Sequence, residues 1–157
     1  MSSYISTKIF DGFSTVFRQW RAVDTHCSYL HGYDVYFKVW FEGALDEKNW
    51  VWDFGGMKRT KHTIDGMNPK EWMEYMFDHT VIIAADDPEI ESFKALNSKK
   101  VIQLRIVETV GAERFAELIY NKLQPFIQTA TEGRVRIKQI EFFEHSKNSA
   151  IYIPSQS

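Results

Sequence analysis

An alternation of apolar and polar residues between positions 33 and 42 is the clearest pattern along the chain. A repeat of two residues is typical of a strand with one buried face. The apolar positions are Tyr33, Val35, Phe37, Val39 and Phe41, and the polar ones between them include Asp34, Lys38 and Glu42. A polar turn at residues 44–48 and an apolar run at 50–54 predict a hairpin whose second strand returns along the first.

Helical signals follow this hairpin. A helical stretch is expected at residues 57–65, where Gly66 interrupts it. A second helix should begin at Asn68-Pro69, because asparagine is a good N-cap and proline suits the first helical position. This helix is expected to end near residue 77 and to turn Trp72, Met73 and Met76 toward the core. An apolar stripe between residues 111 and 123 predicts a further amphipathic helix.

The remaining segments are mostly extended. The predicted strands cover residues 4–23, with a bend at Gly12, and residues 80–84, 101–107, 134–143 and 150–153. A polar excursion from 86 to 97 has room for a short helix. No linker or repeat divides the chain, so we expect one domain over residues 1–157. Strands that alternate with helices suit an α+β fold, in which helices cover one face of an antiparallel sheet.

Composition narrows the class of protein. The net charge of −2 gives no reason to expect a nucleic-acid or membrane partner. The single cysteine excludes an internal disulfide and fits a reducing compartment. No run is apolar enough to span a bilayer, and the first residues lack a signal-peptide pattern, so a cytoplasmic protein is expected. The aromatic share of 15% suits a sheet with subunit contacts, or simply an aromatic core.

Reactive side chains gather in the loop before the alternating strand. Cys27 follows His26 and lies four residues before His31. A neighbouring imidazolium would favour the thiolate, which is the form that accepts a proton or attacks carbon. A lone cysteine is also commonly a small buried apolar residue.

Two further candidates lie later in the chain. Asp78-His79 is an acid–imidazole pair, and it equally fits an ordinary helix end. Glu144 ends a predicted strand, where a solvated carboxylate is the simpler interpretation.

Taken together, Cys27-x-x-x-His31-Gly32-Tyr33, Asp78-His79 and Glu144 resemble the active-site layout of the 6-pyruvoyl- and 6-carboxy-tetrahydropterin synthase family. The resemblance extends over about residues 10–152. It implies a T-fold, with an antiparallel four-stranded sheet and two long helices on one face. It also implies trimers whose sheets close into a barrel and stack as homohexamers, with active sites between subunits.

The resemblance implies a lyase that acts on 7,8-dihydroneopterin triphosphate or a related pterin, in the bacterial branch for 7-deazaguanine and queuosine biosynthesis. Cys27 would take a proton from the substrate side chain, and Asp78 with His79 would form the second acid/base. Glu144 would hold the 2-amino-pyrimidinone edge through two parallel hydrogen bonds. Glu113 matches a family glutamate, although an acid near a helix N-terminus also has a structural explanation.

The zinc site that the resemblance implies is altered in this sequence. The family places a histidine at the end of a Phe-x-Ala-Ala-His run and two more in His-Gly-His. Phe17 and Tyr33 occupy the first and last of these positions, so His31 is the surviving ligand and His26 a candidate substitute. One histidine would hold zinc weakly, so we expect zinc to be absent or held differently.

Two other functions remain open at this point. The first is a metal-free T-fold protein that binds a pterin or purine without turnover. The second is an enzyme of the same fold that carries out a different reaction on a related heterocycle.

Overall fold

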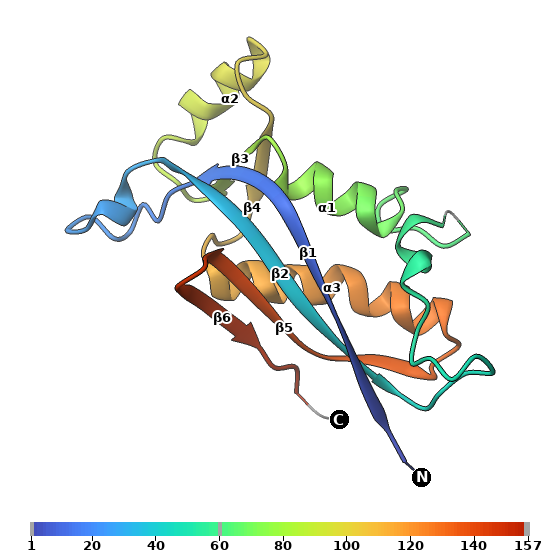
Figure 1. Cartoon of the computed structure of the whole chain (residues 1–157). Coiled ribbons are helices and arrows are strands. Elements are labelled where there is room, and N and C mark those ends of the chain that lie inside the picture. The colour runs from blue at the N-terminus through green and yellow to red at the C-terminus, as the bar shows by residue number, and fades with distance from the viewer. Residues whose placement is uncertain (1, 60, 156–157) are drawn as a thin grey trace.

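The computed structural model describes residues 2–59 and 61–155 as a twisted sheet with helices packed against it (Figure 1). Within these residues the six strands are β1 (Tyr4–Phe17), β2 (His31–Gly43), β3 (Thr80–Ala84), β4 (Leu104–Val107), β5 (Val135–His145) and β6 (Asn148–Tyr152). The α-helices are α1 (Pro69–Phe77), α2 (Ile90–Ser98) and α3 (Ala112–Ala130), with short 3-10 turns η1 (His26–Ser28) and η2 (Phe54–Lys58). None of the helices in the described residues is both long and apolar enough to cross a membrane.

The sheet confirms the α+β class but corrects its predicted detail. The strand order is β4-β3-β1-β2-β5-β6. The part formed by β1, β2, β5 and β6 is antiparallel, as expected, whereas β3 runs parallel to β1 and β4 parallel to β3. The sheet is therefore six-stranded and mixed, not four-stranded. All five residues of β3 are buried, which is typical of a parallel strand that is covered on both faces.

The helices also differ from the expected pair of long ones. α3 has 19 residues and lies along the sheet, but α1 has only nine. α2 projects away from the rest of the molecule and has no buried residue (Figure 1). α3 runs past Pro125 to Ala130 and so is longer than the predicted helix.

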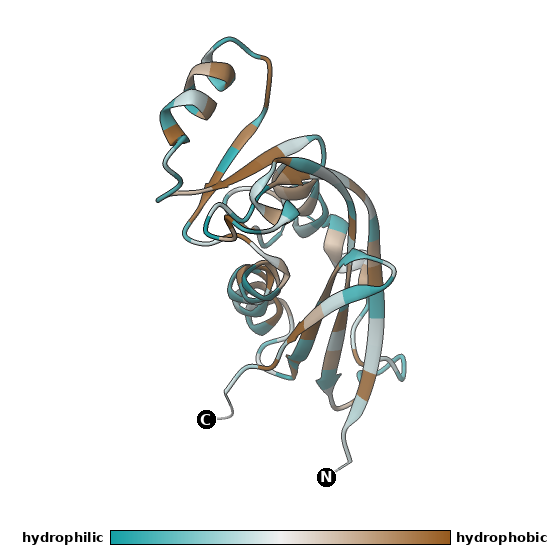
Figure 2. Ribbon diagram, turned by 90° about the vertical axis from the view of Figure 1, so that its left-hand side faces the viewer, coloured by the Kyte–Doolittle hydropathy of each residue, from teal (hydrophilic) through white to brown (hydrophobic). Residues whose placement is uncertain are grey.

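The core lies between the sheet and the helices α1 and α3 (Figure 2). The alternation in β2 is confirmed, because Val35, Phe37, Val39 and Phe41 are fully buried. Phenylalanine rings from β2, α1, α3 and β5 meet at the centre of the core. Phe142 of β5 lies 5.5 Å from Phe77 and 5.3 Å from Phe115 between ring centroids.

The predicted hairpin strand at 50–54 is wrong. Val51 and Trp52 are buried, as their apolar character requires, but they belong to no strand. Both edges of β2 are already paired, one with β1 and the other with β5. Asp53 instead accepts a hydrogen bond from the N–H of Gly55 at 2.9 Å and begins η2.

The predicted helix at 57–65 is also wrong. Among the residues described between 54 and 67, only η2 at Phe54–Lys58 is helical, and Ile64 and Met67 form a small isolated bridge. The first strand ends at Phe17, earlier than expected, and the chain from 18 to 30 forms a loop. The predicted bend at Gly12 is confirmed, because Gly12 has a φ of 85° where the β1–β2 register shifts.

The start of α1 is confirmed. Asn68 accepts a hydrogen bond from the N–H of Glu71 at 2.8 Å, and its amide donates to the carbonyl of Lys58 at 3.2 Å. One side chain therefore caps α1 and ties it to η2.

We expect Asn68→Ala to lower the free energy of unfolding by about 1–2 kcal/mol, because it removes both contacts. Asn68→Asp should lose less, since a carboxylate still caps the helix but cannot donate to Lys58. Urea unfolding of the two variants measures the difference. Equal stability of Asn68→Ala and the wild type would contradict the role of Asn68.

Candidate functional site

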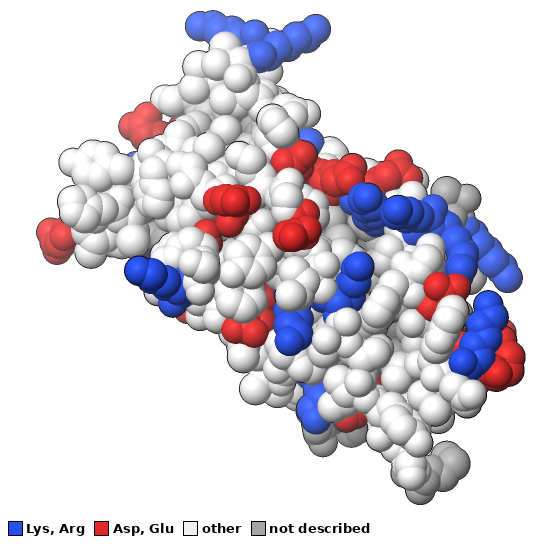
Figure 3. Space-filling model, in the orientation of Figure 1, with Lys and Arg blue, Asp and Glu red and all other residues white. Residues whose placement is uncertain are grey.

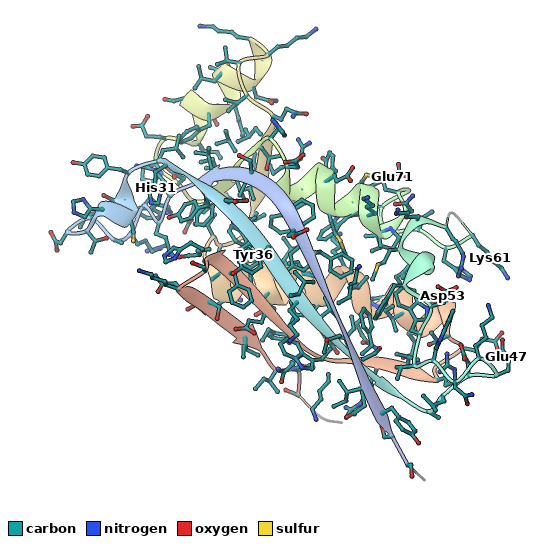
Figure 4. The ribbon with its side chains drawn as sticks, viewed as in Figure 1. His31, Tyr36, Glu47, Asp53, Lys61 and Glu71 are labelled. Carbon is teal, nitrogen blue, oxygen red and sulfur yellow. The ribbon has the colours of Figure 1, made fainter. Side chains whose placement is uncertain are left out.

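The candidate residues Cys27, His31, Tyr33 and Glu144 lie near one end of the sheet, where β1 ends and β2 begins. His31 is seen beside the 18–30 loop in Figure 4, at the opposite end of the molecule from Asp53 and Glu71. The antiparallel register places Phe17 opposite His31. The N-terminus of α3 joins this group, because Glu113 and the backbone N–H of Ala112 are near enough to Glu144 to influence its pKa.

An aromatic stack occupies the centre of this group. The ring of Tyr33 lies on Phe17 with 4.0 Å between centroids and only 7° between planes. Phe17 beneath it is fully buried. The Tyr33 hydroxyl makes a hydrogen bond of 2.8 Å with Nε2 of His31. Burial raises the pKa of Tyr33 to about 12, with smaller contributions from the nearby Glu144 and Cys27. Tyr33 therefore stays protonated at neutral pH and can act as a hydrogen-bond donor.

Glu144 is a carboxylate in an unfavourable position. Burial raises its pKa, and the neighbouring carboxylate of Glu113 raises it further. His145, His31 and the N–H of Ala112 act in the opposite direction without overcoming these effects. A half-buried acid of this kind gains most from a ligand that offers N–H donors.

Cys27 is exposed on η1. Its carbonyl accepts a hydrogen bond from the N–H of Gln19 at 2.7 Å, and its own N–H donates to the hydroxyl of Thr25 at 3.1 Å. The apolar alternative for Cys27, a buried filler of the core, is therefore wrong.

Asp78 and His79 form a pair, but this pair does not lie beside the stack of Tyr33 on Phe17. Their side chains lie 3.1 Å apart, from Oδ1 of Asp78 to Nδ1 of His79. The same Oδ1 accepts the N–H of Ser14 in β1, and the N–H of His79 donates to the carbonyl of Ser14. Ser14 is three residues from Phe17, or about 10 Å along the strand. The pair therefore lies at a distance from the stack within one chain.

A cavity of about 520 Å³ lies beside Asp78, between β1, η2 and α1. Its charged lining residues are Lys8, Lys58, Lys70, Asp11, Glu74 and Asp78. The positive and negative charges that line this cavity are equal in number. Basic and acidic side chains are also interspersed over the face seen in Figure 3. The cavity thus has no bias toward one sign of ligand charge.

Two of the three residues at the expected zinc positions do not fit that ion. Phe17 has no donor atom, and the hydroxyl of Tyr33 is already bonded to His31. His26 is exposed on η1. In the part of the chain that the structure describes, no group of three or more His, Cys, Asp or Glu side chains is arranged to hold a metal ion.

Sequence reasoning missed one element of this region, the ion pair between Arg18 and Asp87. It joins the start of the 18–30 loop to the turn after β3 with a shortest distance of 2.6 Å. The adjacent acids Asp86-Asp87 could have indicated a basic partner, but a partner 69 residues away cannot be identified from sequence spacing.

Comparison with known proteins now bears on this arrangement. The sequence model of the 6-pyruvoyl tetrahydropterin synthase family matches residues 6–155.

The chain belongs to the 6-pyruvoyl tetrahydropterin synthase family.

Solved structures agree with this membership at the level of the fold. An uncharacterized protein from Wolinella succinogenes, WS1659, has a TM-score of 0.77 and 19% identity, over 99% of this chain and all of that one. The Caenorhabditis elegans 6-pyruvoyl tetrahydropterin synthase has a TM-score of 0.63 and 18% identity, over 99% and 98%. The Plasmodium vivax synthase has a TM-score of 0.62 and 13% identity, over 95% and 97%. A comparison with curated protein sequences found no match.

Membership of this pterin synthase family confirms the resemblance seen in the sequence and supports a pterin synthase-like function. The 6-pyruvoyl tetrahydropterin synthase fold is present here with an altered centre, in which Tyr33 stacks on Phe17.

The raised pKa of Glu144 has a consequence for stability. An acid whose pKa is higher in the folded than in the unfolded state stabilises the fold fully below its unfolded pKa, about 4.3, and loses that contribution as the pH rises through the folded pKa. We therefore expect Glu144→Gln to have a higher Tm than the wild type at neutral pH. The difference should disappear at low pH, where Glu144 is protonated in both states.

Thermal unfolding at both pH values measures this effect. The exposed Glu47 offers a matched control, because Glu47→Gln makes the same chemical change in a turn far from the site. A Glu144→Gln variant that is no more stable than the wild type at neutral pH would contradict the strained position of this carboxylate.

Proposed function

We propose that this protein is a 6-carboxy-tetrahydropterin synthase-like lyase that acts on 7,8-dihydroneopterin triphosphate or a closely related pterin, with a role in 7-deazaguanine and queuosine biosynthesis. The observation that carries the proposal is Glu144. Its carboxylate is half-buried with a raised pKa, and no ion pair to it is present among the described residues. A pterin offers two parallel N–H donors, which match the two oxygens of one carboxylate.

The other candidate residues take complementary roles in this proposal. Cys27 is exposed on η1, close enough to Tyr33 to affect the pKa of its hydroxyl, and would take a proton from the substrate side chain. The Asp78–His79 pair would supply the second acid/base, with the carboxylate orienting the imidazole.

We propose that the Asp78–His79 pair reaches the site from a neighbouring subunit, in a trimer or hexamer. Within one chain the pair is about 10 Å along β1 from the Phe17 end. The strand edges support such an assembly. Among the described residues, β3 pairs with β1 only at Thr15–Phe17, which leaves one edge of the first part of β1 free, and β6 pairs only with β5. Free edges of this kind are commonly covered by another chain.

We also propose that the site works without the three-histidine zinc centre. Tyr33 and His31 place a hydroxyl and an imidazole where that centre would require metal ligands. Both groups can make hydrogen bonds to an oxygen of the ligand side chain, which is a weaker form of polarisation than a metal provides.

The same observation favours a second candidate function, a T-fold protein that binds a pterin or purine without turnover. Such a protein needs Glu144 but neither zinc nor a complete acid/base set. An enzyme with a different reaction on a related heterocycle is a third candidate. Turnover of 7,8-dihydroneopterin triphosphate, compared between the wild type and Cys27→Ala, separates catalysis from binding alone.

Pterin binding by Glu144 can be tested with neopterin and biopterin by calorimetry. Glu144→Gln keeps the size of the side chain but removes the charge and one acceptor. We expect it to cost about 2–4 kcal/mol of binding free energy. Glu141→Gln, on the same strand, should bind as the wild type does. If the wild type binds neither compound, or if Glu144→Gln binds equally well, the proposed pterin site is wrong.

Metal content provides a separate test. Protein purified without added metal should contain zinc well below one ion per chain, because Phe17 and Tyr33 replace two ligands. Elemental analysis of the wild type and of His31→Ala makes the comparison. Near-stoichiometric zinc in the wild type that is lost in His31→Ala would contradict the metal-free site.

A further inference from the structure

The loop that carries Cys27 contacts the core through Trp20, near its start, and the segment around Cys27 itself lies outside the core. Between residues 18 and 30 no residue is buried. Val23 and Tyr29 are each 72% exposed, and Leu30 is 42% exposed. Apart from Trp20, apolar packing therefore contributes little to the position of this loop. The segment around Cys27 depends mainly on polar contacts for its conformation.

The strongest of these contacts comes from Arg18. Its Nε and Nη2 donate to the two carboxylate oxygens of Asp87 at 2.9 Å and 2.6 Å. Its remaining nitrogen, Nη1, donates to the carbonyl of Ser28 at 3.3 Å. Ser28 follows Cys27 directly, and the carbonyl of Cys27 itself accepts the N–H of Gln19, the neighbour of Arg18. Arg18 and Gln19, at the start of the loop, therefore hold the backbone of Cys27 and Ser28 close to the end of β1.

The partner of Arg18 is itself rigidly placed. The side chain of Asp87 has no exposed surface, and it also accepts the N–H of Glu89 at 2.8 Å. The N–H of Asp87 donates to the carbonyl of Ala84 at the end of the buried strand β3. A bidentate pair has a fixed geometry, and removal of Arg18 would leave the buried charge of Asp87 without compensation. Through Asp87, the loop is anchored to the end of the buried strand β3.

We propose that Arg18, fixed by Asp87, is a positioning residue that holds Cys27 in place at the candidate site. The contacts of Arg18 support the positioning role. The effect of Arg18 on turnover rests on the proposed function, in which Cys27 takes a proton. Arg18 acts through the backbone of Ser28 and does not touch the ligand.

The chain contains a matched control for this pair. Arg21 in the same loop contacts Asp86 in the same turn at 2.7 Å, but these side chains are 73% and 53% exposed. An exposed pair of this type contributes little to structure. Arg18 and Arg21 thus differ in burial and geometry but not in the segments that they join.

Local order is measured first, by amide hydrogen exchange of the Cys27 segment in the full-length protein. Arg18→Lys keeps the charge and the fold but cannot make the bidentate contact and the bond to Ser28 together. We expect exchange in residues 26–30 to become faster by about tenfold in Arg18→Lys and Arg18→Gln, and to change little in Arg21→Lys and Arg21→Gln. Circular dichroism confirms that each variant is folded, and Arg18→Lys keeps the test valid if Arg18→Gln does not fold.

Turnover of 7,8-dihydroneopterin triphosphate is measured second. We expect Arg18→Lys to lower kcat by about tenfold to a hundredfold with KM nearly unchanged, because Glu144 still binds the pterin while Cys27 is misplaced. Arg21→Lys should keep both constants. A role limited to stability would leave kcat intact in a folded Arg18→Lys variant.

The outcomes separate this proposal from the proposed function. Unchanged hydrogen exchange and unchanged kcat in folded Arg18→Lys would overturn the positioning role. A wild type that turns over no pterin would contradict the proposed lyase activity alone, and hydrogen exchange would then still decide whether Arg18 holds the Cys27 segment.

Discussion

The antiparallel pairing of β1 with β2 is the constraint on which the other features of the molecule depend. Because side chains alternate between the two faces of a strand, a shift of one residue would expose the whole apolar face of β2. The observed register sets Phe17 opposite His31 and Thr15 opposite Tyr33. This register therefore determines which rings meet at the site and where the Cys27 loop begins. The same end of β1, at Thr15–Phe17, pairs with β3 on its other edge. The chemistry of the site is a consequence of core packing at the end of two strands.

The acid at Glu144 shows how the fold and the proposed function oppose each other. Burial and the neighbouring Glu113 both disfavour its charged form, so the free protein carries an unfavourable carboxylate at neutral pH. A ligand with N–H donors would supply the compensation that the protein lacks. Sites of this kind reduce stability in favour of binding, which is a common reason for a poorly placed charge in an otherwise consistent structure.

Local signals in the sequence predicted much of the fold, and long-range pairing accounts for the rest. The N-cap at Asn68 and the strand Thr80–Ala84 depend on neighbouring residues, and both were predicted correctly. The apolar run at 50–54 correctly indicated burial of Val51 and Trp52. An apolar pattern does not show which strand a segment pairs with, and the edge of β2 expected for this segment pairs with β5 instead. In the site, the resemblance to the pterin synthase family indicated Cys27 and Glu144, and their roles stay predictions. The contact of Arg18 with Asp87 depends on the path of β3 and could not be read from spacing.

The aromatic stack indicates that the two departures from the family's zinc positions form one unit. Phe17 is fully buried, with Tyr33 on its face and Phe115 against its edge at 5.0 Å. A histidine at position 17 alone would place a polar ring in this apolar setting, which is costly unless the ring finds a polar partner. A histidine at position 33 alone would remove the ring that covers Phe17 and the hydroxyl that bonds to His31. Phe17 and Tyr33 therefore suit each other, and the stack stabilises a centre that is built from aromatic packing and a hydrogen bond.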